Sequence, residues 1–126
     1  MAFLAAPFSR TLVVSHAFGI IPALEPKDPD DVLNYVFDFG EWLDDEAVTL
    51  ASYTVAIDAP TTPALAIDSH ASDADPLASP APIPGRNVCV WLSAGALDID
   101  YLVRLRGVTS AGQTFDRSFW LPVRRR

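Results

Sequence analysis

Apolar and polar residues alternate through much of the second half of the chain. The apolar positions recur mostly at a spacing of two in three segments, residues 88–92, 101–105 and 115–123. This spacing is typical of β-strands with one face on a core, because successive side chains of a strand point to opposite faces. Gly-containing connections at residues 93–95 and 110–112 favour tight turns between these segments. The pattern predicts three consecutive strands.

A similar alternation in the first half predicts two further strands, at residues 33–39 and 48–57, separated by a turn or one helical turn at residues 40–45. No segment has a convincing helical period, which favours an all-β fold. We therefore predict an antiparallel, immunoglobulin-like β-sandwich, in which Tyr101 at the start of a strand resembles a tyrosine corner. A small β-barrel is the alternative, because alternation does not show whether a sheet closes.

Proline and aspartate interrupt this pattern in two places. Residues 25–31 combine two prolines with three aspartates, which favour turns over regular structure. They predict a boundary between an N-terminal apolar arm, residues 1–26, and a β-sandwich domain, residues 27–126. Residues 58–85 hold six of the eleven prolines. This segment is predicted to be a Pro/Ala/Asp-rich loop, interrupted at most by a short strand near residues 64–67.

The arm is either a first strand or a docking segment. Prolines and Arg10 interrupt its apolar stretch, so it predicts neither a transmembrane helix nor a cleaved secretory signal. No partner strand can be assigned to it from the sequence, and we expect it to extend from the sandwich and bind another subunit. Its predicted interface residues are Phe3, Leu4, Phe8, Leu12 and Val13.

Composition and charge narrow the class of protein. Half of the 126 residues are hydrophobic, which predicts one folded domain and argues against intrinsic disorder. A formal net charge of −7 argues against nucleic acid or an anionic membrane as the main partner. Cys89 is the single cysteine, which excludes an intramolecular disulfide, and with two histidines it does not complete a structural zinc site.

Residues that could support catalysis or metal binding are few. Ser93 follows Trp91 by two positions, where a hydrolase nucleophile elbow requires glycine. His16 and His70 have no neighbouring acids that would define a triad. The acidic clusters at residues 28–31 and 44–46 lack the spacing of a calcium loop, and turn formation explains them. We predict no catalytic residue, no metal and no cofactor.

Two features favour binding to another protein. Trp120 alternates out of phase with the core-facing residues of its predicted strand, and Trp91 has a similar ambiguity; each is either an interface anchor or covered by a second layer such as the arm. The chain is also asymmetric in charge, with six of eight arginines after residue 103 and 13 of 16 acids between residues 25 and 75. Opposite charges would let copies meet head to tail. The basic residues assigned to this interface are Arg117, Arg124, Arg125 and Arg126.

Several blocks of the sequence resemble a family of small tailed-phage virion proteins of the fibre–tail adaptor type. The segment KDPDDVLNY at residues 27–35, with FDFGEWL at 37–43, is similar to the opening of that family. The blocks VWLSAG at 90–95, TSAGQT at 109–114 and DRSF at 116–119 resemble its third and last strands. The resemblance covers residues 27–123 and leaves out the arm, while residues 73–85 also depart from the family pattern.

The resemblance implies a structural, non-enzymatic component of the phage particle, assembled in the host cytoplasm. Its expected partners are other virion proteins of the tail, neck or fibres, and we expect several symmetric copies per particle. A carbohydrate-binding β-sandwich that contacts a host surface glycan is the alternative, with Trp91 and Trp120 as stacking platforms. A calcium-dependent adhesion module is a third possibility.

Overall fold

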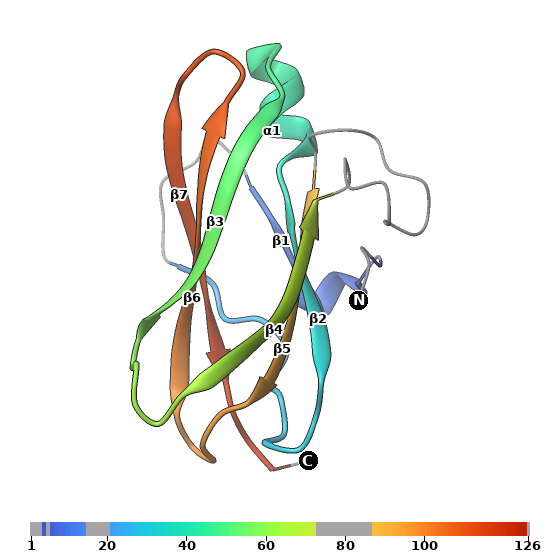
Figure 1. The fold of residues 1–126 in the computed structure, drawn as a ribbon. Helices are drawn as coiled ribbons and strands as arrows, with labels where there is room; N and C mark the ends of the chain where they lie inside the picture. Colours follow the sequence, from blue (N-terminus) through green and yellow to red (C-terminus); the bar gives the residue numbers. More distant parts are fainter. Residues whose placement is uncertain (1–3, 5, 15–20, 73–86, 126) are drawn as a thin grey trace.

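Two β-sheets face each other in the computed structural model, which describes residues 4, 6–14, 21–72 and 87–125 (Figure 1). One sheet has the strand order β1-β2-β5-β4 and the other the order β3-β6-β7. The elements along the chain are the 3₁₀ turn η1 (Phe8–Arg10), β1 (Thr11–Val13), β2 (Leu33–Asp38), α1 (Gly40–Glu46), β3 (Leu50–Ala59), β4 (Leu65–Ser72), β5 (Asn87–Ala94), β6 (Asp100–Thr109) and β7 (Thr114–Pro122).

The predicted all-β sandwich is therefore confirmed, and the described strands form two separate sheets rather than a closed barrel. The five strands and the helical turn read from alternation are all present. All pairings between named strands are antiparallel except that of β1 with β2, which is parallel. One face of each sheet supplies side chains to a shared core.

Aromatic rings from both sheets fill the centre of this core. Tyr35 and Phe37 on β2 contact Phe119 on β7, with ring centroids 5.5 and 5.3 Å apart. All three side chains are fully buried. Such ring pairs contribute beyond the area that they bury, so they fix how the two sheets face each other.

Tyr101 makes the contacts expected of a tyrosine corner. Its hydroxyl accepts a hydrogen bond from the Ala96 amide at 2.9 Å and donates one to the Pro63 carbonyl at 2.8 Å. The ring is fully buried. The hydroxyl thereby ties the turn before β6 to the connection between β3 and β4.

The predicted loop at residues 58–85 contains more strand than the sequence indicates. β3 continues to Ala59, and β4 runs to Ser72, well beyond the short strand predicted near residues 64–67. Ala, Ser and Asp have low strand propensity, but backbone pairing of β4 along β5 and the burial of Leu65 and Ala71 outweigh it. Residues 73–85 lie outside the described residues.

The N-terminal segment contacts both sheets. Of the two alternatives for this arm, a first strand or a docking segment, residues 11–13 form a first strand. β1 pairs with β2, and Leu12 and Val14 are buried in the main core. Further along, Ala23 forms a parallel bridge to Trp120 on β7, and Lys27 forms one to Val123 just after β7. We call residues 6–14 the first leg and residues 21–27 the second leg of a seam strap, because the legs lie on opposite sheets at one open side of the sandwich (Figure 1).

No helix within the described ranges is long and apolar enough to cross a membrane.

Candidate protein interface

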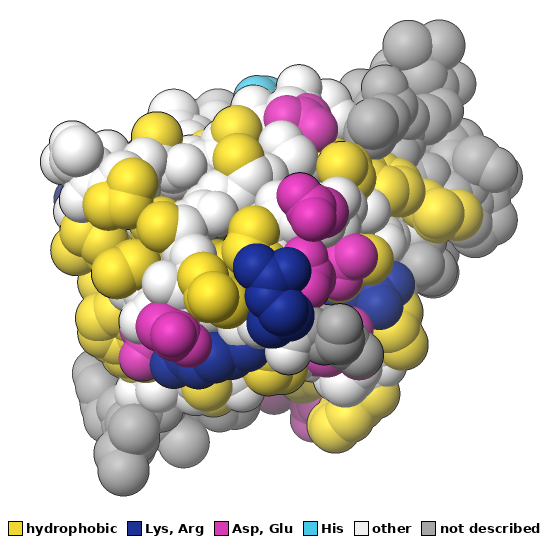
Figure 2. Space-filling model, turned by 90° about the horizontal axis from the view of Figure 1, so that it is seen from below, with side chains coloured by type: hydrophobic (Ala, Val, Ile, Leu, Met, Phe, Trp, Pro, Cys, Tyr) yellow, Lys and Arg dark blue, Asp and Glu magenta, His cyan; other side chains and the backbone are white. Residues whose placement is uncertain are grey.

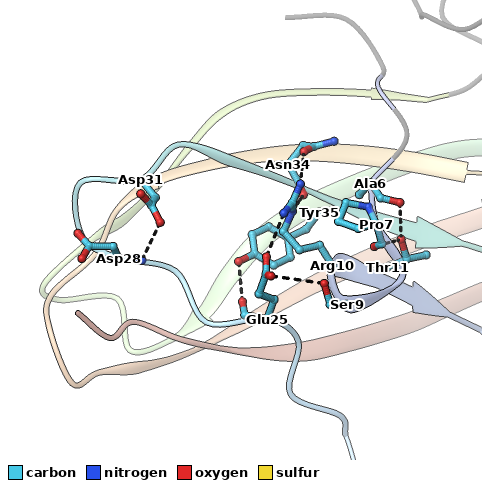
Figure 3. A network of polar contacts seen from close by, with 10 residues as sticks. All are labelled: Ala6, Pro7, Ser9, Arg10, Thr11, Glu25, Asp28, Asp31, Asn34 and Tyr35. Carbon is cyan, nitrogen blue, oxygen red and sulfur yellow. Dashed lines mark hydrogen bonds and ion pairs between the residues drawn. The ribbon is translucent and has the colours of Figure 1, made fainter. Parts of the chain in front are cut away.

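Arg10 connects the two legs of the seam strap to β2 (Figure 3). Its guanidinium forms an ion pair with Glu25 at 2.9 Å and donates hydrogen bonds to the carbonyl and side-chain oxygens of Asn34 at 2.9 and 3.2 Å. The buried Asn34 side chain in turn donates to the Leu4 carbonyl at 3.0 Å. Charge-assisted bonds of this kind are the stronger ones, so they hold the first leg in a fixed position.

The chain preceding η1 covers part of the outer face of the β1-β2-β5-β4 sheet. Val36, Ala71 and Cys89 form a small buried cluster on this face, and Ala6 and Trp91 pack against it. Burial raises the pKa of the Cys89 thiol, against smaller opposing effects of the Leu4 backbone and the Asn34 side chain. Trp91 is therefore half-buried over a second small core. Of its two alternatives, an exposed interface anchor or a residue under a second layer, the geometry is nearer to the second.

The first leg also holds apolar side chains out in solvent. Phe8 is 86% exposed, and Leu4 before the leg and Val13 on β1 are each 46% exposed. Leu12 was expected at an interface with another protein, but it is buried, because alternation on β1 turns its side chain into the core. Phe3 lies outside the described residues. An ordered backbone that exposes a phenylalanine is a typical site for contact with another protein.

The basic residues assigned to an interface mostly make contacts within the chain. Arg124 forms an ion pair with Asp100 at 2.7 Å. The Arg117 guanidinium lies 5.4 Å from the ring centroid of Trp42, and it donates a hydrogen bond to the Asp116 carbonyl at 2.7 Å. Arg125 is exposed, and Arg126 lies outside the described residues.

Other arginines are paired in the same manner. Arg104 contacts Asp58 at 3.0 Å, and Arg106 contacts Asp116 at 2.8 Å. The hydrogen bond from Arg106 lowers the pKa of the Asp116 carboxyl. Seen from below, dark-blue basic side chains lie beside magenta acidic ones, with apolar side chains around them (Figure 2). Internal pairing reduces the positive charge that these residues could offer to an acidic partner.

Trp120 lies on the solvent face of β7, out of phase with the buried Phe119 and Leu121, as alternation predicted. Its side chain is half-buried rather than exposed. Its backbone pairs with the second leg, donating to the Pro22 carbonyl at 2.8 Å and accepting from the Leu24 amide at 3.0 Å. The seam strap thus occupies the edge of β7 beside this residue.

Lys27 is a buried residue that sequence reasoning missed. Its ammonium donates to the carbonyls of Asp28 and Ala94, both at 2.7 Å, and to that of Pro29 at 3.4 Å. Burial lowers the pKa of Lys27, while the nearby carboxylates, of which Asp31 has the largest effect, oppose the shift. The signal available in the sequence was a single lysine within a run of prolines and aspartates at the domain boundary.

The groups considered for catalysis have other partners in the structure. The Ser93 hydroxyl donates to Asp68 at 2.6 Å, and the His70 ring contacts the Tyr53 hydroxyl at 2.8 Å. His16 lies outside the described residues. Within the part of the chain that the structure describes, no three His, Cys, Asp or Glu side chains gather as metal ligands would.

The site is thus an ordered N-terminal strap on a two-sheet β-sandwich, with exposed apolar side chains on its first leg. Residues 27–122 match the family described as podophage GP4 fiber-tail adaptor protein gp77, and the chain belongs to this family. The resemblance seen in the sequence is thereby confirmed, and the family is one of structural phage tail adaptors. No curated protein matches the chain. The match begins at Lys27, so almost all of the seam strap precedes it.

Proposed function

We propose that the chain joins the tail of a podophage particle to its fibres, in several copies, by protein–protein contact and without catalysis. The family supports a structural adaptor role in the particle. Such an adaptor needs surfaces for other virion proteins, and a preformed surface lowers the entropy lost on binding.

The observation that carries this proposal is the exposure of Phe8 on an ordered part of the chain. Its ring is 86% exposed, although the polypeptide around it is fixed by the Arg10 bonds to Glu25 and Asn34. Burying a phenylalanine side chain contributes about 1.5–3 kcal/mol relative to leaving it in water. Together with Leu4 and Val13, Phe8 therefore provides an apolar anchor that would be buried when the adaptor docks.

Particles assembled without this chain provide the test. Purified chain is added to them, and the bound fraction is measured against concentration. The substitution Phe8→Asp should weaken binding by about 30-fold or more, which corresponds to about 2 kcal/mol. The thermal unfolding midpoint should not change, because the ring makes little contact with the fold.

Leu97→Asp is the matched control, since Leu97 is also an exposed large apolar residue, 40% exposed, on the turn before β6. It should bind as the wild type does. Equal binding by Phe8→Asp and wild type would contradict the assignment of the docking surface to the first leg.

The sequence also suggested docking of the basic residues near the C-terminus on an acidic partner surface, and the structure supports this mode of binding less well than apolar contact. Arg117 and Arg124 already have partners within the chain, which leaves Arg125 as the exposed basic residue of the described part of that set. The glycan-binding alternative needs exposed aromatic platforms, but Trp91 and Trp120 are both half-buried. Apolar contact through the first leg is the mode of binding that the observed geometry favours.

A further inference from the structure

The first leg of the seam strap is separable from the body of the sandwich. Among the described residues, the main core cluster has 17 buried members, of which Leu12 and Val14 come from this leg. The remaining core residues lie between residues 35 and 123, on α1, on strands of both sheets other than β1, or next to these elements. The body therefore supplies most of the core on its own, and we expect it to stay folded when the first leg leaves it.

The surface under the first leg is complementary to that leg in detail. Thr11, Leu12 and Val13 are in register with residues 36–38 of β2. Beyond the pairing, Arg10 finds its acceptors on Asn34 and Glu25. Every copy of the chain carries both this leg and this surface, so a second copy can offer the same contacts.

The chain between the legs is long enough for the first leg to reach a neighbour. Seven residue steps connect Val14, at the end of the first leg, to Ile21, at the start of the second. At about 3.3–3.6 Å per residue, an extended connection of this length spans up to about 25 Å. This approaches the diameter of a small domain, about 30 Å. The reach does not span a whole domain, but it suffices for the first leg to lie on a neighbour packed against this side while the second leg stays on its own β7.

We infer that the first leg is exchanged between copies in the assembled adaptor, with β1 of one chain paired to β2 of its neighbour. The inference rests on the proposed presence of several copies in the particle. The same residues make the same contacts in the closed monomer and in the exchanged form, so exchange adds no new interface. A high local concentration of copies then favours the exchanged form.

Single cysteines at paired positions of β1 and β2 test the inference in the full chain. Thr11 and Val36 are in register on adjacent strands. Their side chains share the outer face, because Leu12 and Phe37 next to them both point into the core. Adjacent strands lie about 4.8 Å apart, within the range of Cα separations that a disulfide spans. Cys89 must be replaced by Ala, since it is in register with Val36 and would compete for the new thiol.

In this background, a Thr11→Cys chain and a Val36→Cys chain are co-expressed and oxidised. A disulfide between these two chains forms only when the leg of one lies on the body of the other. We expect at least tenfold more covalent heterodimer than covalent dimer of either variant expressed alone. Arg104→Cys with Ser118→Cys is the matched control, because these positions are in register on β6 and β7, which the inference leaves unexchanged. This pair should give no heterodimer.

A chain carrying both Thr11→Cys and Val36→Cys completes the test. Exchange predicts covalent dimers and larger species, whereas a permanently closed molecule gives only internally bridged monomer. Bridged monomer together with no heterodimer would overturn the inference. Rejoining of the wild-type chain to particles that lack it is measured separately, so loss of the adaptor function and absence of exchange are distinguishable outcomes.

Discussion

Lys27 shows how one side chain can hold several turns together. Its ammonium contacts the carbonyls of Asp28 and Pro29 on one turn and that of Ala94 at the end of β5. Its backbone amide donates to the Pro122 carbonyl, and its carbonyl accepts from the Arg124 amide. The residue therefore links the second leg, the lead into β2 and the end of β7. No local period in the sequence reports contacts of this kind.

Replacing Lys27 by Met should destabilise the fold at neutral pH by about 2 kcal/mol, because it removes a buried ammonium that donates to three backbone carbonyls, and hydrogen bonds to charged groups contribute about 1.5–3 kcal/mol each. The pKa of Lys27 is lowered in the folded state, chiefly by burial, from a usual value of 10.5. As pH rises between the folded and unfolded values, the unfolded chain holds more protons and the wild type gains stability. The difference between wild type and Lys27→Met should therefore widen toward pH 10.5.

Urea unfolding of both proteins from pH 7 into this alkaline range measures the difference. Arg125→Met serves as the control, since it removes one positive charge from an exposed position. It should change neither the stability nor its pH dependence. A gap between wild type and Lys27→Met that stays constant or narrows with pH would show that burial of the ammonium is not the dominant effect.

At the scale of elements, β1 separates two residues that the sequence analysis had treated alike, Leu12 and Val13. Leu12 points into the core and Val13 points to solvent. Leu12→Ala should lower the free energy of unfolding by about 2–4 kcal/mol, the usual cost of deleting a buried leucine side chain. Val13→Ala on the same strand should change it by less than about 0.5 kcal/mol. Chemical denaturation measures both, and equal effects would mean that β1 is not docked as observed.

Alternation in the sequence located β2, β5, β6 and β7, but it did not report the second buried face of β2 or the full length of β4. β6 and β7 alternate clearly, because their outer faces meet solvent. β2 has four consecutive buried residues at 34–37, because the first leg and the chain before it cover its edge and outer face. For β4, residues of low strand propensity pair along β5, and pairing partners distant in sequence leave no local pattern.

The sequence located some residues of the candidate interface but not their contacts within the chain. Of the apolar residues that the sequence places before the domain, Phe8 and Leu4 are exposed, whereas Leu12 is buried. The contact of Arg117 with Trp42 joins β7 to α1, and only the folded chain brings these two residues together. Runs of charge indicate how a surface is composed, but tertiary structure decides which charges are already paired.

At the scale of the whole molecule, the sandwich keeps a core of its own while the first leg closes one side. Removing residues 1–14 takes away Leu12 and Val14 but leaves the other core residues in place. The shortened chain should stay folded, with a loss of several kcal/mol, since one buried leucine accounts for about 2–5 kcal/mol. It should also uncover Cys89, which is now fully buried in the cluster that Ala6 covers.

Cys89 then becomes a reporter of whether the first leg is docked. Burial raises the pKa of its thiol, so uncovering it increases both access and the thiolate fraction. We expect a thiol reagent to modify the shortened chain at least tenfold faster than the full chain under native conditions. Leu12→Ala is the control, because it weakens the fold but keeps the covering backbone of the leg. Equal rates for the shortened chain and Leu12→Ala would show that Cys89 reacts through general unfolding, and the first leg would then not be a separable cover of this face.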